Sequence, residues 1–298
     1  MSRWTRADIP DQSGRTVLVT GANSGLGLQT SLALAGSGAR VLMACRNPQK
    51  AEGALQRIRG EVPHATVELV SLDLASLASI ESAAEDVAGR VQKLDVLINN
   101  AGVMAIPRSI TADGFEMQLG TNHLGHFALT GRLLPLLRQS PAPRVVTVAS
   151  TAHKPGVIRF DDLMGEQSYG RWSAYSQSKL ANLLFTSELD RRHGDWLVAA
   201  AAHPGYANTH LQSGQGNLLL ELTMRLGNAL LAQSDAQGAL PQLYAATMPD
   251  VVGNDYYGPH LFELRGYPVK SGRTQRAKSS ADAARLWTLS EELTKVSY

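Results

Sequence analysis

Two side chains four residues apart, Tyr175 and Lys179, could together move a proton. The segment 172–192 has a helical pattern, and a spacing of four places both residues on one face of a helix. Tyrosine normally has a pKa of about 10, which is too high for easy proton exchange at pH 7. A nearby ammonium favours the phenolate and lowers that pKa. The pair is therefore a candidate acid and base.

A second chemical signal is a loop rich in glycine, Thr20-Gly21-Ala22-Asn23-Ser24-Gly25-Leu26-Gly27. It lies between the first apolar run and a helical pattern. Glycines let the backbone turn tightly and let a pyrophosphate approach a helix N-terminus, where free N–H groups and the helix dipole favour anions. A glycine loop alone is weak evidence, but after the first strand of a βαβ unit it strongly predicts a dinucleotide site.

The elements that must position these residues alternate along the chain. Short apolar runs predict strands at 15–20, 39–44, 66–70, 94–98, 144–149 and 196–202. Helical patterns lie between them at 25–36, 48–59, 76–90, 112–138 and 172–192. Asn47 is the expected N-cap of the second helix. Runs that are apolar on both faces indicate a parallel sheet covered by helices on both sides.

We therefore predict an α/β fold, a Rossmann-type doubly wound parallel sheet of about seven strands. No linker or change of composition divides the chain, so residues 1–298 are read as one domain. Its core is expected at about 15–265, with polar N-terminal and C-terminal extensions. A last helix, 280–295, is expected to pack on the body.

Composition excludes several classes of protein. The chain has 298 residues, a net charge of +2 and no basic tract, which argues against a nucleic-acid binder. No apolar run is long enough to span a bilayer, and the N-terminus lacks the apolar core of a signal peptide. Cys45 is the single cysteine, so no internal disulfide can form and a reducing, cytoplasmic setting is expected.

The order of motifs resembles that of the short-chain dehydrogenase/reductase family over about residues 15–210. The matching features are the Thr-Gly-x-x-x-Gly-x-Gly loop, Asp73-Leu74, Asn99-Asn100-Ala101-Gly102, Asn122, Ser150, Tyr175-x-x-x-Lys179, Pro204-Gly205 and Thr209. The long interval from Ser150 to Tyr175, and segments such as Ala44-Cys45-Arg46-Asn47, look like the retinol dehydrogenase-like branch. Eukaryotic members of that branch often carry an N-terminal membrane anchor, for which this sequence shows no apolar segment.

The resemblance implies a role for each matching residue. Tyr175 would exchange the proton of the substrate oxygen, Ser150 would hydrogen-bond that oxygen, and Lys179 would bind the nicotinamide ribose. Asn122 would hold a water that links Lys179 to solvent. The implied cofactor contacts are Gly21, Asn23, Ser24, Gly25, Leu26, Gly27, Arg46, Asp73, Leu74, Asn100, Ala101, Gly102, Tyr175, Lys179, Pro204, Gly205 and Thr209.

The choice of nicotinamide cofactor depends on the end of the second strand. A carboxylate there would bind the ribose 2′-OH of NAD. This chain has Cys45 and then Arg46 instead. A guanidinium can bind a 2′-phosphate through charge-assisted, bidentate hydrogen bonds, so NADP(H) is the expected cofactor. The alternative is that Arg46 is an ordinary exposed arginine.

Several alternatives stay open. Thr151 competes with Ser150 as the hydroxyl donor. His123 and His126 have a spacing seen in metal sites, but no further ligands, so packing or capping is favoured and no metal is expected. His153 could line the substrate cleft. The apolar segment 216–232 is either a wall for a hydrophobic substrate or a packed helix or subunit interface.

The predicted function is that of an enzyme, an oxidoreductase acting on a small-molecule carbonyl or alcohol. The rival class is a non-catalytic NADP(H)-binding sensor or scaffold, which has no need to keep Asn122, Ser150, Tyr175 and Lys179 together. The glycine spacing disfavours an epimerase. The sequence leaves open the substrate, the direction of the reaction and whether the chain forms a homo-oligomer.

Overall fold

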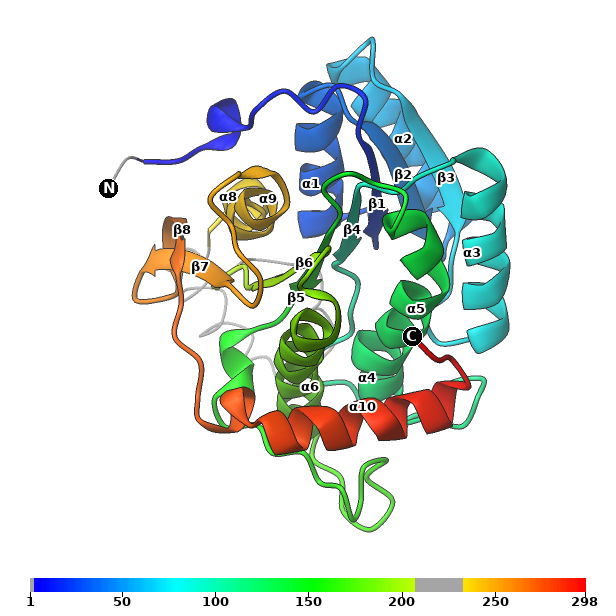
Figure 1. Ribbon diagram of the computed structural model, residues 1–298, viewed down its shortest axis with the longest axis vertical. Helices are drawn as coiled ribbons and strands as arrows, with labels where there is room; N and C mark the ends of the chain where they lie inside the picture. Colours follow the sequence, from blue (N-terminus) through cyan, green and yellow to red (C-terminus); the bar gives the residue numbers. More distant parts are fainter. Residues whose placement is uncertain (1–2, 207–232) are drawn as a thin grey trace, which may run out of the picture.

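The computed structural model describes residues 3–206 and 233–298, and within them one sheet of eight strands forms the centre (Figure 1). The strand order is β3-β2-β1-β4-β5-β6-β7-β8, and only the β7–β8 pair is antiparallel. The strands are β1 (Thr16–Thr20), β2 (Arg40–Cys45), β3 (Val67–Ser71), β4 (Val96–Asn99), β5 (Arg144–Val148), β6 (Val198–Ala202), β7 (Tyr256–Leu261) and β8 (Arg265–Lys270). The doubly wound fold is confirmed, with β8 adding an edge strand to the seven expected.

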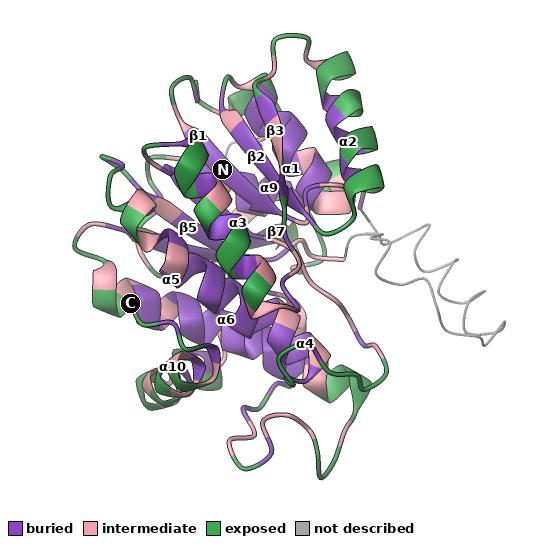
Figure 2. Ribbon diagram, turned by 90° about the vertical axis from the view of Figure 1, so that its right-hand side faces the viewer, coloured by how far each residue is buried: buried purple, intermediate pink, exposed green. Residues whose placement is uncertain are grey.

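Helices cover both faces of the sheet, as the apolar runs predicted. One face carries α1 (Gly25–Gly36), α2 (Pro48–Glu61), α8 (Asp235–Gly238) and α9 (Leu240–Thr247), and the other carries α3 (Leu77–Arg90), α5 (Gly125–Leu137) and α6 (Arg171–His193). Alternate residues of one strand enter opposite cores: Val17 and Val19 pack with α1, whereas Leu18 packs with α3 and α5. Figure 2 shows buried residues filling the strands and the inner faces of the helices.

The predicted helix 112–138 begins later and is divided. Its first residues form a turn instead, in which Gly114 has a φ of +86° and Thr111 pairs with Phe115 through backbone N–H and carbonyl. Helical structure starts with α4 (Met117–Leu119), widens into a π-helical turn, η2 (Gly120–Leu124), and continues as α5. Short 3₁₀ turns occur at η1 (Arg6–Asp8), η3 (Thr151–His153) and η5 (Arg276–Lys278).

The hydrophobic core extends beyond the expected boundaries of 15 and 265. The last helix, α10 (Ser280–Thr294), packs across α6, and its Trp287 is 2% exposed. The Trp287 ring stacks on Phe185 and meets Phe127 edge to face. The Tyr298 hydroxyl donates a hydrogen bond of 2.6 Å to the Phe127 carbonyl. The C-terminal segment is thus part of the core, because it carries aromatic side chains among its polar ones.

The topology fixes where a ligand can bind. β1 lies between β2 and β4, so the chain reverses its winding direction at this point. In open α/β sheets the loops on either side of such a reversal diverge and leave a crevice beyond the carboxyl ends of the strands. The loops after β1, β2 and β4 therefore meet at one edge.

No helix within 3–206 or 233–298 is both long and apolar enough to cross a membrane.

Candidate functional site

A cleft of about 470 Å³ opens at this edge, beside the glycine-rich loop. Its wall contains every predicted residue of the loop and of the three following motifs: Gly21, Asn23, Ser24, Gly25, Leu26, Gly27, Arg46, Asp73, Leu74, Asn100, Ala101 and Gly102. Residues that sequence reasoning missed also line it: Ala44, Asn47, Lys50, Leu72, Val103 and Thr121. Among the missed residues, Lys50 adds a second cation beside Arg46.

The loop is packed so closely that one glycine in it is obligatory. A Cβ on Gly27 would lie 2.2 Å from the Gly21 carbonyl oxygen and 2.7 Å from the Asn100 amide nitrogen. Real Cβ atoms do not approach backbone this closely, so only glycine brings α1 up against the end of β1. The first turn of α1 therefore directs its free N–H groups into the cleft, where they can bind phosphate oxygens.

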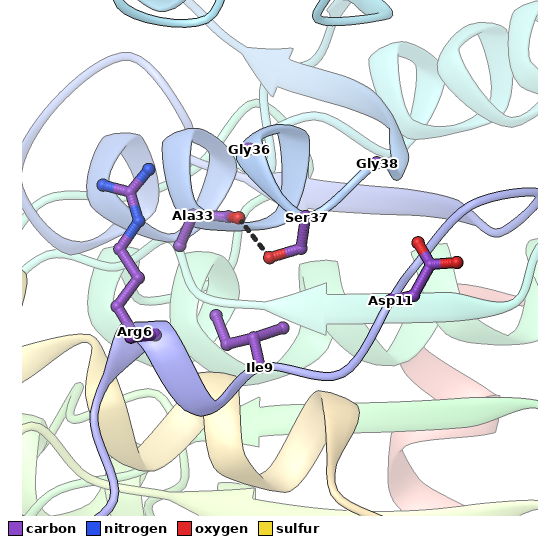
Figure 3. Close-up of a pocket in the computed structure, with 8 residues that line it drawn as sticks. Arg6, Ile9, Asp11, Ala33, Gly36, Ser37 and Gly38 are labelled. Carbon is purple, nitrogen blue, oxygen red and sulfur yellow. Dashed lines mark hydrogen bonds between the residues drawn. The ribbon is translucent and has the colours of Figure 1, made fainter.

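The hollow at the opposite end of α1 is larger, but none of the predicted site residues lines it. It lies between η1 and the end of α1, near Arg6 and Asp11 (Figure 3). The Arg6 guanidinium donates to the Leu32 carbonyl, and the Ser37 hydroxyl donates to the Ala33 carbonyl. These bonds satisfy carbonyls at the C-terminus of a helix. The candidate site is accordingly the cleft at the glycine loop.

Tyr175 and Lys179 lie on α6, and both side chains are buried. The Lys179 ammonium is 5.7 Å from the centroid of the Tyr175 ring and donates a 3.0 Å hydrogen bond to the Val148 carbonyl. Asn182, on the next turn, donates to the same carbonyl at 3.1 Å. A Cβ on Gly102 would be 3.6 Å from Lys179 Nζ. The pair therefore sits next to the inner wall of the cleft.

The environment of Tyr175 differs from the expected one. Burial raises the pKa of Tyr175 to about 12, although a hydrogen bond with the Ser150 side chain lowers it. Burial also lowers the pKa of Lys179 to about 8. The sequence predicted that Lys179 would lower the pKa of Tyr175. In the protein without cofactor the pKa is raised instead, because burial removes water from around the phenolate and this effect exceeds the lowering by neighbouring groups.

Ser150 stands directly after β5, and its side chain faces Tyr175. The Ser150 hydroxyl oxygen accepts a 3.1 Å hydrogen bond from the Ala152 N–H, and the side chain also bonds to Tyr175. Thr151 is in the 3₁₀ turn that begins after Ser150. The geometry favours Ser150 over Thr151 as the hydroxyl nearest to the reacting atoms.

Asn122 lies in the π-helical turn and connects the cleft wall to α6, the helix that carries Tyr175 and Lys179. Its amide accepts from the Val103 N–H at 2.8 Å and donates to the Val103 carbonyl and the Ser178 hydroxyl, both at 2.9 Å. The Asn122 carbonyl is 3.0 Å from His126 Nδ1. Turns with π geometry often mark functional sites. The role of Asn122 in holding a water stays a prediction.

Thr20 is a structural partner of the site that sequence reasoning missed, and it bonds to His126, for which the sequence favoured packing or capping. The Thr20 hydroxyl oxygen accepts from the N–H groups of Asn100 and Ala101 at 2.9 Å each, and lies 2.9 Å from His126 Nε2. One hydroxyl thus connects the end of β1 with the segment after β4 and with the first turn of α5. His123 pairs with the Ser290 hydroxyl instead, and the described residues contain no cluster of potential metal ligands.

Two further predicted contacts, Pro204 and Gly205, are not among the residues that line the cleft. Pro204 and Gly205 follow β6, where the Pro204 carbonyl accepts from the Gln233 side chain. A Cβ on Gly205 would meet the Leu264 carbonyl at 2.3 Å. Thr209 and the apolar segment 216–232 lie outside the described residues.

Comparison with known proteins agrees with this geometry. The family profile for short chain dehydrogenase matches residues 15–217. The chain belongs to the short-chain dehydrogenase/reductase family. Retinol dehydrogenase 12 of Mus musculus is 42% identical over 97% of this chain and 88% of its own length, which confirms the retinol dehydrogenase-like branch.

Two solved structures of this fold are informative. A putative uncharacterized protein from Mycobacterium Paratuberculosis is 47% identical, with a TM-score of 0.83 over 100% of this chain and 99% of that chain. A Pseudomonas aeruginosa RhlG/NADP active-site complex is 25% identical, with a TM-score of 0.65 over 82% of this chain and 94% of that one. Membership in the short-chain dehydrogenase/reductase family makes this chain an oxidoreductase acting on alcohols or carbonyls.

The buried histidines of this site give the protein a testable acid sensitivity. Burial lowers the pKa of His123 to about 3 and that of His126 to about 4, so both stay neutral in the folded state at pH 5. In the unfolded chain they bind protons below about pH 6.5. The free energy of unfolding should therefore fall as the pH drops below 6.5, by roughly 1.4 kcal/mol per pH unit for each histidine.

Urea unfolding between pH 7 and pH 5 measures this slope. His123→Gln should make the slope shallower by about one proton. An identical slope in the wild-type protein and the His123→Gln variant would contradict the assignment.

Proposed function

We propose that the protein is an NADP(H)-dependent oxidoreductase that transfers a hydride between the nicotinamide and a carbonyl or alcohol. The observation that carries the proposal is the placement of Tyr175 and Lys179, 5.7 Å apart from ring centroid to ammonium, against the inner wall of a cleft shaped for a pyrophosphate, with the Ser150 side chain close enough to lower the pKa of Tyr175. A non-catalytic sensor would need the cleft but not this pair of hydroxyls. We further propose a cytoplasmic location, from the single cysteine.

The residues present fit a nicotinamide dinucleotide. The absence of a Cβ at Gly27 lets the start of α1 pack against the end of β1 and border the cleft, and Asp73 and Leu74 provide a wall suited to the adenine. Lys179 would bind the nicotinamide ribose, as in the family. The bound cofactor supplies or accepts the hydride at the nicotinamide ring.

Side chains of the protein transfer the proton that accompanies the hydride. In the direction of reduction, Tyr175 donates its hydroxyl proton to the substrate oxygen while the carbonyl carbon gains the hydride. The Ser150 hydroxyl oxygen accepts from the Ala152 N–H, so its proton is left to donate: to Tyr175 in the free protein, and to the substrate oxygen once the substrate is bound. Lys179, with a pKa lowered to about 8, can then return a proton toward Tyr175. Oxidation of an alcohol runs the same steps in reverse.

The raised pKa of Tyr175 indicates that the cofactor contributes to its activation. Burial disfavours a phenolate at this position and raises the pKa of Tyr175 to about 12. An oxidised nicotinamide carries a positive charge, which stabilises the phenolate when an alcohol is to be deprotonated. We therefore expect the pH dependence of alcohol oxidation to follow the pKa of Tyr175 in the complex with the oxidised cofactor, and not its pKa in the free protein.

Cofactor preference is proposed from the rim of the cleft. The Arg46 guanidinium lies 4.0 Å from the Asp73 carboxylate, and the Arg46 side chain is 71% exposed. An exposed ion pair of this kind contributes little, so the guanidinium can turn toward a 2′-phosphate. Lys50, one turn into α2, lines the same part of the cleft. Cys45 does not line it, because its thiol is buried against the N–H groups of Ala22 and Asn23.

Binding should consequently favour NADPH over NADH. Arg46→Ala should weaken NADPH roughly ten- to hundredfold, because hydrogen bonds to charged groups contribute about 1.5–3 kcal/mol, and leave NADH almost unchanged. Lys50→Ala should act in the same direction. The control is Arg57→Ala on the same helix, which pairs with Glu61 and does not line the cleft. Titration by tryptophan fluorescence measures each affinity. Equal affinities of the wild-type protein for NADH and NADPH would contradict the proposed role of Arg46 and Lys50 in cofactor preference.

A hydrophobic substrate is proposed from the surroundings of Tyr175. Trp172, one turn earlier on α6, is 54% exposed and meets the Tyr175 ring edge to face at 6.1 Å. An exposed indole beside the reacting hydroxyl offers an apolar surface to a substrate. A panel of aldehydes, ketones and alcohols of increasing apolar size, followed by nicotinamide absorbance with NADPH and NADP⁺, tests the proposal. Cofactor binding without turnover on any of them would favour the sensor.

A further inference from the structure

His153, three residues after Ser150, is buried and bonded to the carbonyl of that serine. Its ring Nδ1 lies 2.7 Å from the Ser150 carbonyl oxygen, and its backbone N–H donates to the same oxygen at 3.0 Å. Only 1% of the residue is exposed. The imidazole therefore lies beneath the residue that faces Tyr175, and does not line the cleft at the glycine loop.

The bond to the carbonyl defines the state of the ring. Burial lowers the pKa of His153, so the imidazole is neutral at pH 7 and has one N–H. A carbonyl can only accept, which assigns that N–H to Nδ1. Nε2 is then an acceptor, and it is buried with no hydrogen-bond partner among the described residues.

An unpaired buried nitrogen is unfavourable, and an apolar side chain of similar size would avoid it. A histidine at this position can therefore contribute only through Nδ1, which donates to the Ser150 carbonyl. The Nδ1–H group fixes the peptide of Ser150 from below, while the Ala152 N–H fixes the Ser150 hydroxyl oxygen from the side. Together with the His153 backbone N–H, these hydrogen bonds restrain both the carbonyl and the hydroxyl of Ser150.

We propose that His153 is a positioning residue, which holds Ser150 so that its hydroxyl proton is directed toward the substrate oxygen. The inference rests on the proposed function and adds to it a residue that touches neither substrate nor cofactor. The ring of His153 is held in place by Tyr256, which it meets edge to face at 5.7 Å with an interplanar angle of 83°. A tilt of the imidazole would displace the Ser150 carbonyl, because the two groups share a hydrogen bond.

Two amide substitutions separate this role from simple packing. The side-chain amide of asparagine can occupy the place of Nδ1, so His153→Asn keeps the donor to Ser150. The amide of glutamine reaches the place of Nε2, so His153→Gln keeps a polar group in the pocket but loses that donor. Tyr256→Phe is the matched control, because the Tyr256 hydroxyl is a second unpaired buried group beside the ring and has no bond to Ser150.

His153→Gln should lower kcat roughly ten- to hundredfold, since small displacements of a group that contacts the reacting atoms have effects of this size. The Kd for NADPH should change less than twofold. His153→Asn should retain kcat within about threefold, and Tyr256→Phe within about twofold. In a Ser150→Ala background, His153→Gln should lower kcat no further.

A merely structural role would give a different pattern. Equal losses in His153→Asn and His153→Gln, or a cofactor Kd that weakens in step with kcat, would overturn the inference. If His153→Gln does not fold, the asparagine variant still decides the question, because a loss of kcat beyond tenfold in that variant contradicts the proposal. Absence of turnover in the wild-type protein would count against the proposed function instead, so the two failures are distinguishable.

Discussion

Tyr175→Phe is expected to reduce turnover by a factor of about 10²–10⁴, the range that general acid–base catalysis contributes. The substitution removes only the hydroxyl that donates the proton. The ring is 7% exposed and packed, so its apolar contacts stay. NADPH affinity should change by no more than a few-fold, because Lys179 and the glycine loop are untouched.

The measurement is steady-state turnover of a verified substrate, together with a fluorescence titration of NADPH. Tyr244→Phe is a suitable control, since its hydroxyl bonds to Asp250 on the surface and lies outside the cleft lining. Retention of most of the activity by Tyr175→Phe would show that the acid has been assigned to the wrong residue.

Lys179→Met should abolish turnover and yet stabilise the protein at pH 7. Burial lowers the pKa of Lys179 from 10.5 to about 8, a shift that corresponds to about 3 kcal/mol of unfavourable free energy for the charged form. Methionine fills a similar space without charge. The lost hydrogen bond to Val148 offsets about 1 kcal/mol of this gain, and Asn182 still satisfies that carbonyl.

The sign of this effect can be checked by changing the pH. Below pH 8 the native lysine is charged and its burial is fully unfavourable. Between pH 8 and 10.5 the unfolded chain holds the proton that the native state has lost, so wild-type stability rises with pH. The advantage of Lys179→Met in urea unfolding should therefore fade toward pH 10.5. A destabilised variant at pH 7, or a difference that does not change with pH, would contradict the argument.

Much of the fold could be predicted from the sequence because the signals are local. Runs such as 39–44 are apolar on both faces, which only a covered parallel strand requires, and β2 spans Arg40–Cys45. Asn47 accepts the Lys50 N–H as the expected N-cap of α2. The last helix was also expected, although the aromatic contacts of Trp287 that make it part of the core were not.

The features that escaped prediction depend on long-range packing. Asn122, in the π-helical turn, bonds to Val103 and Ser178, and no periodicity of the sequence reveals such contacts. The raised pKa of Tyr175 reflects burial by distant elements. Lys50 could have been found, because it lies one turn after an N-cap that follows the second strand and thus at the same edge as Arg46.

The bonds of the Thr20 hydroxyl bear on how such a protein could be altered by design or by evolution. Thr20 and His126 are buried and connect the end of β1, the segment after β4 and the first turn of α5, so a change in either would disturb all three together. Arg46 and Lys50 belong to the same cleft but lie at its solvent-facing rim. Cofactor choice and catalytic alignment thus reside in separate layers of the site. An engineer could exchange the rim cations to recruit another dinucleotide while the inner layer keeps its alignment.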